Sequence, residues 1–450
     1  MQALKATLPA ALTFALALTW SFASPSAHHE PANPQNGWYR SWYGQPPGAA
    51  GTVRAPGQSL PGARPPARAM QFPGPGESAD FREGRRLFER ETFGGNGRTC
   101  LTCHSQDTGT VSPEDALQRF QSHPNDPLFI HDGSDDEDED GFGDNQHVTR
   151  MLADATILMR IPLHDNVTLR DDPTARFVTV RRGIPTTLNT PALDPVLMLD
   201  GRQPDLMAQA LGAITDHAQG TASAGQRALI AGFQLSNRFF TSPALEAFAR
   251  GGDAPTLPPG HTPSEKRGRT FFEDLPPDFS VAPPNFKPGL WASCHSGPLL
   301  NQTNQFLPVA VPPGTRFQTV LVSELNAAGN PTINFVFANQ EHDLFDGNPD
   351  GIIEVSSPDP GRALISGRAD DLFPFPPGSF DHLNAFKIAP LRGIRRTAPY
   401  FHDNSARTLE DVALHYREFF LIVSAGPDGP AVVLSDQDLA DIVAYLRLLD

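Results

Sequence analysis

Apolar residues recur at helical spacing in several segments of the chain. The first segment begins near Ala79, where Phe81, Leu87 and Phe88 lie among charged residues. The same spacing is found in residues 206–216 and 409–420. Strand-like alternation is rarer and shorter, so the pattern predicts a mainly α fold with long loops.

The closing residues 435–450 form another predicted helix. Ser435 can cap it, and Asp438 stands three residues later, as in a capping box. The apolar face that follows consists of Leu439, Ile442, Val443, Tyr445, Leu446 and Leu449.

An internal repeat suggests how these helices are organised. The block GRRLF at residues 84–88 is echoed by GRTFF at residues 268–272, each within a charged amphipathic segment. A Cys-His motif follows each block, 16 and 26 residues after its glycine. Two copies of one domain would give this pattern, although a five-residue block can also recur by chance.

Composition supplies the domain boundaries. The chain has 450 residues, enough for two or three domains, and its 46 prolines and 38 glycines favour long irregular stretches. Residues 28–77 are rich in Pro, Gly, Ala and Arg and are expected to be a flexible lead. The predicted domains are then 78–250 and 263–450, joined by a Gly/Pro-rich linker at 251–262.

The first 27 residues have the features of a secretory signal peptide. Lys5 provides the positive region and residues 8–20 the apolar region, and Ser21 and Ala23 are small residues at the two positions that a signal peptidase reads. A membrane anchor is the alternative, but the apolar run is short for a bilayer. We expect export to the periplasm without stable membrane insertion after cleavage. The net charge of -16 argues against nucleic acid as a partner and favours a basic one.

The three cysteines point to specific chemistry. Cys100, Cys103 and His104 form the sequence CLTCH, the attachment pattern of c-type haem. Two thiols one helical turn apart can each bond one vinyl group, and the adjacent His can then coordinate the iron. A thioredoxin-like pair would need a βαβ context, and a zinc site would need a second pair of ligands.

A second motif of this kind lacks one cysteine. In WASCH, residues 291–295, Trp291 stands where the first cysteine is expected, while Cys294 and His295 remain. One interpretation is a haem held by a single thioether at Cys294, with His295 as its iron ligand. The other is a relic site with a free thiol, which would be an oxidation liability in an exported protein.

Several blocks in a consistent order resemble the bacterial di-haem cytochrome c peroxidase superfamily, which includes the di-haem enzyme that matures methylamine dehydrogenase. The resemblance covers about residues 79–450. The blocks are PTTLN at 185–189, LDGR at 199–202 followed by Gln209, DPGR at 359–362, FKIAPLRGI at 386–394, TAPYFHD at 397–403 and TLE at 408–410.

This resemblance implies two cytochrome c-like domains, each with a haem, and electron transfer from the C-terminal to the N-terminal haem, where hydrogen peroxide reacts. His104 and His295 would be the proximal iron ligands. The distal ligand of the C-terminal haem is usually Met and here aligns with Tyr416, as in the methylamine-dehydrogenase-maturing branch. His415 is a competing ligand, and Tyr416 can also be an ordinary helix-face aromatic residue.

The sequence departs from the family at three positions. The inter-haem Trp is replaced by Leu199. The Asn that helps to bind an inter-haem calcium ion aligns with Gly183, which weakens the case for calcium although the carbonyls near Thr397 and Pro399 remain. No distal Glu follows Gln209 at the expected distance, where Asp216 and His217 are nearest.

The loss of the distal Glu leaves three roles open for His217. Peroxide cleavage needs a group that takes a proton and returns it, and an imidazole can do so near neutral pH. His217 could instead coordinate the iron, which would make the haem an electron carrier, or it could be a surface residue. Gln209 is the other candidate catalytic residue.

Weaker signals concern metals and further histidines. Residues 135–140 and 346–350 alternate acidic or amide side chains before a glycine, as calcium loops do, but both lack the closing Glu and are more typical of solvated loops. His131, His147 and His164 are further candidate distal ligands, and most other histidines are expected at the surface.

The sequence thus predicts an exported di-haem oxidoreductase that reduces or uses hydrogen peroxide, or oxidises another substrate, with electrons from a small redox protein. Two alternatives remain. A non-catalytic electron carrier would have six-coordinate iron throughout, and an assembly factor would hold one haem only.

Overall fold

In the computed structural model the described residues are 78–130, 148–194, 197–276, 278, 280–281, 285–302, 332–340, 350–369, 383–424 and 432–450. The predicted signal peptide 1–27, the lead 28–77 and the acidic run 135–140 lie outside them, as do His131, His147 and most of the acidic segment 346–350.

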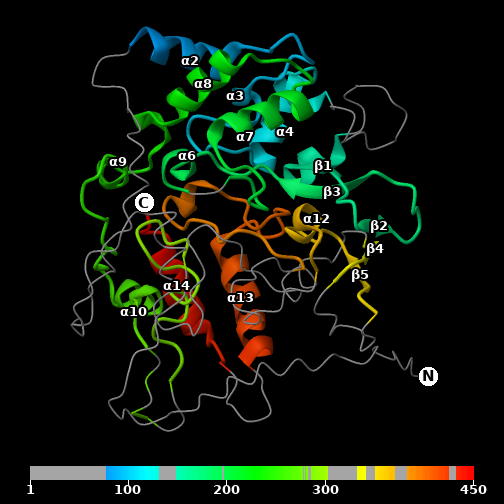
Figure 1. The fold of residues 1–450 in the computed structure, drawn as a ribbon. Coiled ribbons are helices and arrows are strands. Elements are labelled where there is room, and N and C mark those ends of the chain that lie inside the picture. Colours follow the sequence, from blue (N-terminus) through cyan, green and yellow to red (C-terminus); the bar gives the residue numbers. More distant parts are fainter. Residues whose placement is uncertain are drawn as a thin grey trace, which may run out of the picture.

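Helices dominate the first half of the described chain (Figure 1). Its helices are α2 (Ala79–Arg90), α3 (Cys100–Cys103), α4 (Pro113–Ser122), α5 (Thr149–Asp154), α6 (Thr190–Leu193), α7 (Leu206–Gly212), α8 (Ala224–Gln234) and α9 (Pro243–Ala249), with short 3-10 turns at Pro127–Phe129 and Asn237–Phe239. Its strands are β1 (Thr156–Pro162), β2 (Val167–Leu169) and β3 (Phe177–Gly183).

The second half lies below the first in the view of Figure 1 and repeats its helical character. Its helices are α10 (Pro263–Phe272), α12 (Ala363–Ser366), α13 (Leu409–Ser424) and α14 (Asp436–Leu446), with a 3-10 turn at Ile394–Arg396. Its strands are β4 (Ile333–Phe337) and β5 (Ile353–Ser357).

The helices predicted from periodicity are present. The Ser78 side chain caps α2 by accepting from the amide of Phe81 at 3.1 Å. Ser435 and Asp438 form the predicted capping box at the start of α14, which ends at Leu446 rather than at residue 450. Residues 206–216 divide into α7 and a π-helical turn, Ala213–His217. A turn of this kind re-aims the side chains that follow it and is common at functional sites.

The two glycines of the repeat occupy equivalent positions. A Cβ on Gly84 would lie 2.3 Å from the carbonyl oxygen of Leu229 in α8, and one on Gly268 would lie 2.0 Å from that of Asp441 in α14. In both pairs the helices cross at the glycine, where only a hydrogen atom fits between the backbones. The repeat therefore builds the same helix crossing twice, α2 on α8 and α10 on α14.

Two small antiparallel sheets modify the expected mainly α fold. One pairs β1 with β3, and the other has the order β2-β4-β5. Strand β2 belongs to the first half and β4 to the second, with Val167 opposite Phe337. One apolar core joins both sheets, with Val180, Phe335, Phe337 and Ile353 among its most deeply buried members. Separate domains divided at 251–262 do not predict this sheet, because each strand is too short to give a clear alternating pattern.

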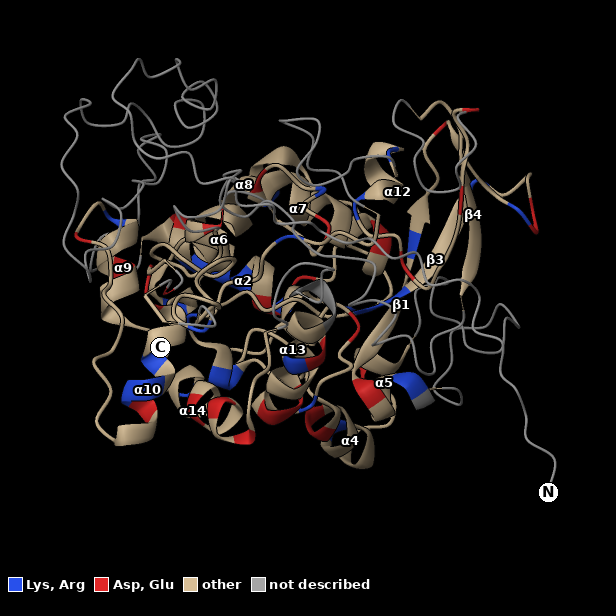
Figure 2. Ribbon diagram, turned by 90° about the horizontal axis from the view of Figure 1, so that it is seen from below, with Lys and Arg blue, Asp and Glu red and all other residues tan. Residues whose placement is uncertain are grey.

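Charged residues of both signs are spread over the surface. Figure 2 shows acidic and basic residues interleaved on α10 and α13, while acidic residues predominate on α14 and α4. Of the helices that the structure describes, none has the length and apolar character required to cross a bilayer.

The two helix crossings predict that Gly-to-Ala substitutions change the free energy of unfolding by different amounts at different positions. Gly84→Ala and Gly268→Ala should each lower the free energy of unfolding by about 1–3 kcal/mol, since the new methyl group meets the backbone of the facing helix. Gly232→Ala is the matched control. It lies within α8, and nothing is within 4 Å of the place that its Cβ would take, so it should be neutral or stabilise by up to about 1 kcal/mol. Urea unfolding of the three variants measures the difference, and equal effects would contradict the repeated crossing.

Candidate functional site

A large cavity in the first half is lined by the residues of the CLTCH motif. Cys100, Cys103 and His104 lie on its wall with Gln209 and His217, and apolar side chains from Leu128, Met151, Met159 and Ile214 complete much of the rest. The space free of atoms is about 1260 Å³, including the open mouth.

The helix α3 positions the two thiols and the histidine. It is a single turn, so Cys100 and Cys103 are one turn apart, and the amide of His104 closes it by donating to the Cys100 carbonyl at 3.0 Å. The ring Nδ1 of His104 donates to the Gly109 carbonyl at 2.8 Å. This fixes the ring orientation and leaves Nε2 as the nitrogen available to a metal.

The ionisation of these groups argues against a thiol-redox or zinc site. Burial raises the pKa of Cys100 to about 12, whereas redox-active cysteines have lowered values. Burial also lowers the pKa of His104, which keeps its ring neutral, the form that binds metals. Over the described residues, no three His, Cys, Asp or Glu side chains gather as a metal-binding cluster.

His217 lies on the same cavity as His104. The two rings are near enough for the charge of His217 to contribute to lowering the pKa of His104. The carbonyl of His217 accepts hydrogen bonds from Asn96 at 2.9 Å and Arg98 at 3.4 Å, which anchors the end of the π-helical turn. Asp216 is exposed and bonds to Thr215, so it is His217 that the turn directs to the cavity.

Of the other predicted ligands, His164 is placed elsewhere. Its ring is exposed and bonds to Asn166 at 2.6 Å, and it does not line the cavity. The prediction of His164 as a distal ligand is therefore wrong. His164 lies between the strands β1 and β2, which place it at the edge of the sheets.

The second motif forms a loop with the same internal bonds as the first. The amide of His295 donates to the Trp291 carbonyl at 2.8 Å, as that of His104 does to Cys100. Its ring Nδ1 bonds to the Leu300 carbonyl at 2.9 Å, again five residues further on. Burial lowers the pKa of His295 to about 4, although hydrogen bonds to the backbone at Leu300 and Ala389 oppose that effect.

Trp291 occupies the position of the missing cysteine and packs into the core of the second half. It is 3% exposed, and its ring lies 5.1 Å from Tyr416 and 5.4 Å from Phe420 between ring centroids. Phe271 and Phe272 of α10 cover its other sides. Because an indole cannot add to a vinyl group as a thiol does, this loop can form one thioether at most.

Tyr416 and His415 stand side by side on α13 but in different surroundings. Tyr416 is near Cys294, and burial raises the pKa of its hydroxyl well above the usual range, with Cys294 adding to the effect. His415 packs on the ring of Phe401, and burial lowers its pKa to about 4. Its Nε2 is buried without a hydrogen-bond partner among the described residues. Both predicted ligands are thus neutral at pH 7, and of the two it is Tyr416 that interacts with Cys294.

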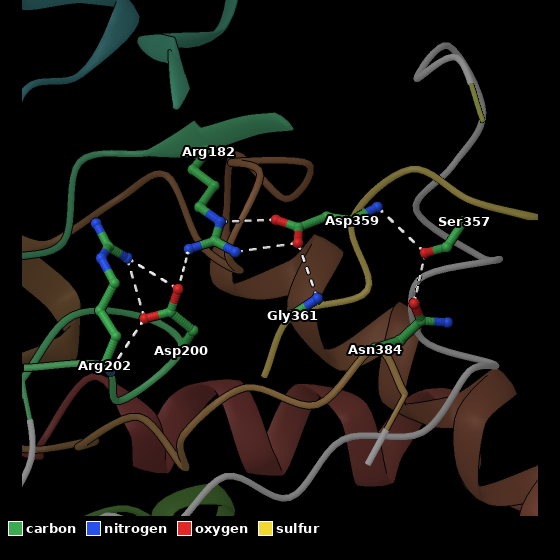
Figure 3. Close-up of polar contacts among 7 residues, drawn as sticks. All are labelled: Arg182, Asp200, Arg202, Ser357, Asp359, Gly361 and Asn384. Atoms are coloured by element: carbon green, nitrogen blue, oxygen red, sulfur yellow. Dashed lines mark hydrogen bonds and ion pairs between the residues drawn. The ribbon is translucent and has the colours of Figure 1, made fainter. Parts of the chain in front are cut away.

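A buried ion network joins the first cavity to the second half (Figure 3). Arg182, at the end of β3, donates to Asp359 at 2.7 and 3.0 Å and to Asp200 at 2.6 Å, and Arg202 also binds Asp200. Burial alone would raise the pKa of Asp200, but the charges of Arg182 and Arg202 outweigh it and bring that pKa to about 2. The LDGR and DPGR motifs contain the two carboxylates and are evident in the sequence. Arg182 lies outside them, and nothing in the sequence marks it as their common partner.

A side chain from the second half lies against Gly183, the position that aligns with a calcium-binding Asn in the family. A Cβ on Gly183 would lie 2.1 Å from the Oδ1 of Asn404. The Asn404 amide donates to the carbonyls of Asp154 and Ala155 at 2.9 and 3.0 Å. Asn404 therefore lies against Gly183, the position at which the resemblance implies a calcium-binding Asn, and its amide ties it to the end of α5.

The donor sets fit haem at both places, in different ways. The first cavity offers two thiols, a neutral imidazole with a free Nε2 and an apolar wall. The second loop offers one thiol and one neutral imidazole, which fits a haem held by a single thioether.

Comparison with known proteins gives matches among solved structures only, since no protein-family model and no curated protein matches the chain. A MauG-like protein associated with microbial copper homeostasis is 18% identical, with 89% of this chain and 95% of that chain covered and a TM-score of 0.38. The diheme peroxidase BthA from Burkholderia thailandensis is 15% identical, with 88% and 95% covered and a TM-score of 0.41. Hydrazine synthase from Kuenenia stuttgartiensis is 15% identical, with 89% and 99% covered and a TM-score of 0.34.

The MauG-like protein and the diheme peroxidase belong to the superfamily that the sequence motifs resemble. At these identities and TM-scores they are likenesses only. What this chain binds and does therefore has to be argued from its own residues.

The ion network predicts a large loss of stability when its centre is removed. Arg182→Met should lower the free energy of unfolding by about 3–5 kcal/mol at pH 7, because Asp200 and Asp359 stay buried without their partner. Arg447→Met, which breaks the half-exposed pair with Glu410, should cost less than about 1 kcal/mol. Urea unfolding measures both.

The same network gives a pH dependence. The folded pKa of Asp200, about 2, is below its ordinary value of 3.8, so its contribution to stability is complete above that value and is lost as the pH falls towards 2. The wild type should lose stability over this window by more than Arg182→Met does. Equal losses would show that Arg182 does not stabilise the charged form of Asp200.

Proposed function

We propose that the chain is an exported c-type cytochrome of the di-haem cytochrome c peroxidase superfamily, acting as an oxidoreductase on hydrogen peroxide. The observation that supports it most directly is that Cys100, Cys103, His104 and His217 line one cavity. Two thiols and two histidines on a mostly apolar wall suit a covalently held haem with a reactive face.

The residues of the first cavity divide into holding and reacting groups. Cys100 and Cys103 would bond the two vinyl groups, and His104, oriented by Gly109, would coordinate the iron through Nε2. When bound, haem supplies the iron at which peroxide is reduced. The apolar walls would keep bulk water from the reacting oxygens.

His217 would move the proton that peroxide cleavage requires. Its ring lines the cavity on the π-helical turn and can take a proton from one peroxide oxygen and return it to the departing one. Gln209 lies about two turns earlier and lines the same cavity, so its amide can donate or accept a hydrogen bond to orient the peroxide.

The second loop would supply electrons to the first cavity. Cys294 and His295 would hold a haem by one thioether, and Tyr416 is the candidate distal ligand because it lies close to Cys294. Tyr416 would lose its proton on binding the iron, and the resulting phenolate would favour oxidised iron over reduced iron. A small redox protein with a basic surface is the expected donor, since the chain carries a net charge of -16.

An electron carrier without catalysis is the second candidate. It is favoured by the approach of His217 to His104, because two imidazoles on one cavity can also occupy both axial positions of a haem. Its iron would be six-coordinate and low-spin and would not react with peroxide. The two candidate functions differ in the role of His217, which transfers a proton in the first and coordinates the iron in the second.

Haem stoichiometry tests the cofactor proposal. Protein matured in a periplasm should carry two haems by mass and by pyridine haemochrome absorbance. Cys294→Ala should release one haem to acid-acetone while the other stays bound, because the first site has two thioethers and the second at most one. Ser293→Ala, on the neighbouring side chain, is the control and should retain both. A wild type with a single haem would rule out the second site and leave the mono-haem assembly factor.

The role of His217 can be decided by His217→Ala. If it is the proton-transferring group, the wild type should show a high-spin ferric EPR signal that changes on peroxide addition, and the variant should reduce peroxide about 10²–10⁴-fold more slowly. His123→Ala, an exposed histidine bonded to Ser122, is the matched control and should be unchanged.

The opposite result would identify the protein as an electron carrier without catalysis. In that case the wild type is low-spin and indifferent to peroxide, and His217→Ala converts it to a high-spin form. Such an outcome would falsify the peroxidase proposal while retaining the haem.

A further inference from the structure

One loop of the cavity wall presents a charged residue in apolar surroundings. Leu197 and Gln203 pair as an antiparallel bridge, with the Leu197 amide donating to the Gln203 carbonyl at 3.0 Å. The residues between them turn sharply, with positive φ at Met198 and Gly201. Leu197, Met198, Leu199 and Arg202 all line the cavity. The loop therefore brings a guanidinium group to a mostly apolar wall.

Four cationic side chains line the cavity, and three have most of their donors engaged. Arg182 binds Asp200 and Asp359 through all three nitrogens. The ammonium of Lys387 binds Asp194 at 2.6 Å, and Arg98 donates to the carbonyls of Pro127 and His217. These three groups hold the wall together.

Arg202 differs from them. Its Nη1 and its backbone amide bind Asp200, whereas Nε and Nη2 have no hydrogen-bond partner among the residues that the structure describes. In Figure 3 these two nitrogens point away from the other residues drawn. The Arg202 side chain is 16% exposed and lines the cavity, so its free edge is mostly withdrawn from solvent.

A guanidinium edge with two free donors on the wall of a cavity suits an anion of matching shape. Nε and Nη2 are the pair with which arginine binds a carboxylate in a bidentate manner. Haem carries two propionate carboxylates on one edge of an otherwise apolar ring. We propose that Arg202 holds a propionate of the haem in the first cavity, through Nε and Nη2.

Asp200 makes this assignment specific. It fixes Nη1 of Arg202 on one side and is itself fixed by Arg182 on the other, so the guanidinium plane is oriented before any ligand binds. The charged groups around Arg202 are Asp200, Arg182, Arg362 and Lys387, with Asp359 behind Arg182. Arg202 is thus a positioning residue for the cofactor. The ion network of Asp200, Arg182 and Asp359 would connect the propionate to the second half.

The experiment compares Arg202→Gln and Arg202→Lys with the wild type, with Arg447→Gln as a surface control, all as full-length holoprotein. Resonance Raman spectra report the bending modes of the propionates, and spectroelectrochemistry reports the reduction potential of the first haem. In Arg202→Gln we expect a propionate mode to shift and the potential to fall, because an unpaired carboxylate near the iron favours the ferric state. Arg202→Lys keeps the charge, so it should restore much of the potential but not the mode. Arg447→Gln should match the wild type in both.

The inference rests on the proposed haem in the first cavity, and the two can fail separately. Pyridine haemochrome absorbance and circular dichroism establish that each variant is folded and holds its haem. If the wild type has no haem, the proposed function fails. If Arg202→Gln and Arg202→Lys carry full haem and both retain the wild-type propionate modes, the assignment of Arg202 is overturned while the proposed function stands.

Discussion

The fold depends on one buried cation that is shared between two carboxylates from distant parts of the sequence. Arg182 comes from β3, Asp200 from the cavity loop and Asp359 from the segment after β5, and all three are almost fully buried. Charges withdrawn from water in this way are tolerated only when their partners are in place, so the network fixes the relative position of three segments. It also forms part of the cavity wall, which means that the shape of the candidate haem site depends on contacts made by the second half.

Burial also sets the chemistry available at the two motifs. It keeps the rings of His104 and His295 neutral and the thiols of Cys100 and Cys294 protonated, so neither loop has the character of a thiol-redox centre. The two loops share their backbone hydrogen bonds and differ mainly in Trp291 against Cys100. The presence of Trp291 in place of a cysteine therefore distinguishes a loop that can hold haem through one thioether from a loop that can hold it through two.

Much of this could be predicted from sequence because the signals were local. Helix periodicity and the Ser435 and Asp438 pair predicted the starts of α2 and α14, and the repeated glycine block proves to lie at both helix crossings. The sheets could not be predicted in this way, since β2 has three residues and pairs with a strand from the other half of the chain. Arg182 and Asn404 were missed for the same reason: their partners are about 180 and 250 residues away, and one sequence gives no information on such pairs.

The sheet β2-β4-β5 has a consequence for the independence of the two halves. The repeated helix crossings suggest that one ancestral unit was copied, and such copies often remain separable. Here β2 completes a sheet with β4, and the core beneath it takes residues from both halves. A chain cut in the 251–262 segment would leave an unpaired strand edge and an uncovered apolar face on each fragment, which favours aggregation over folding. Because the two halves share this sheet and this core, we expect them to unfold together rather than as separate modules.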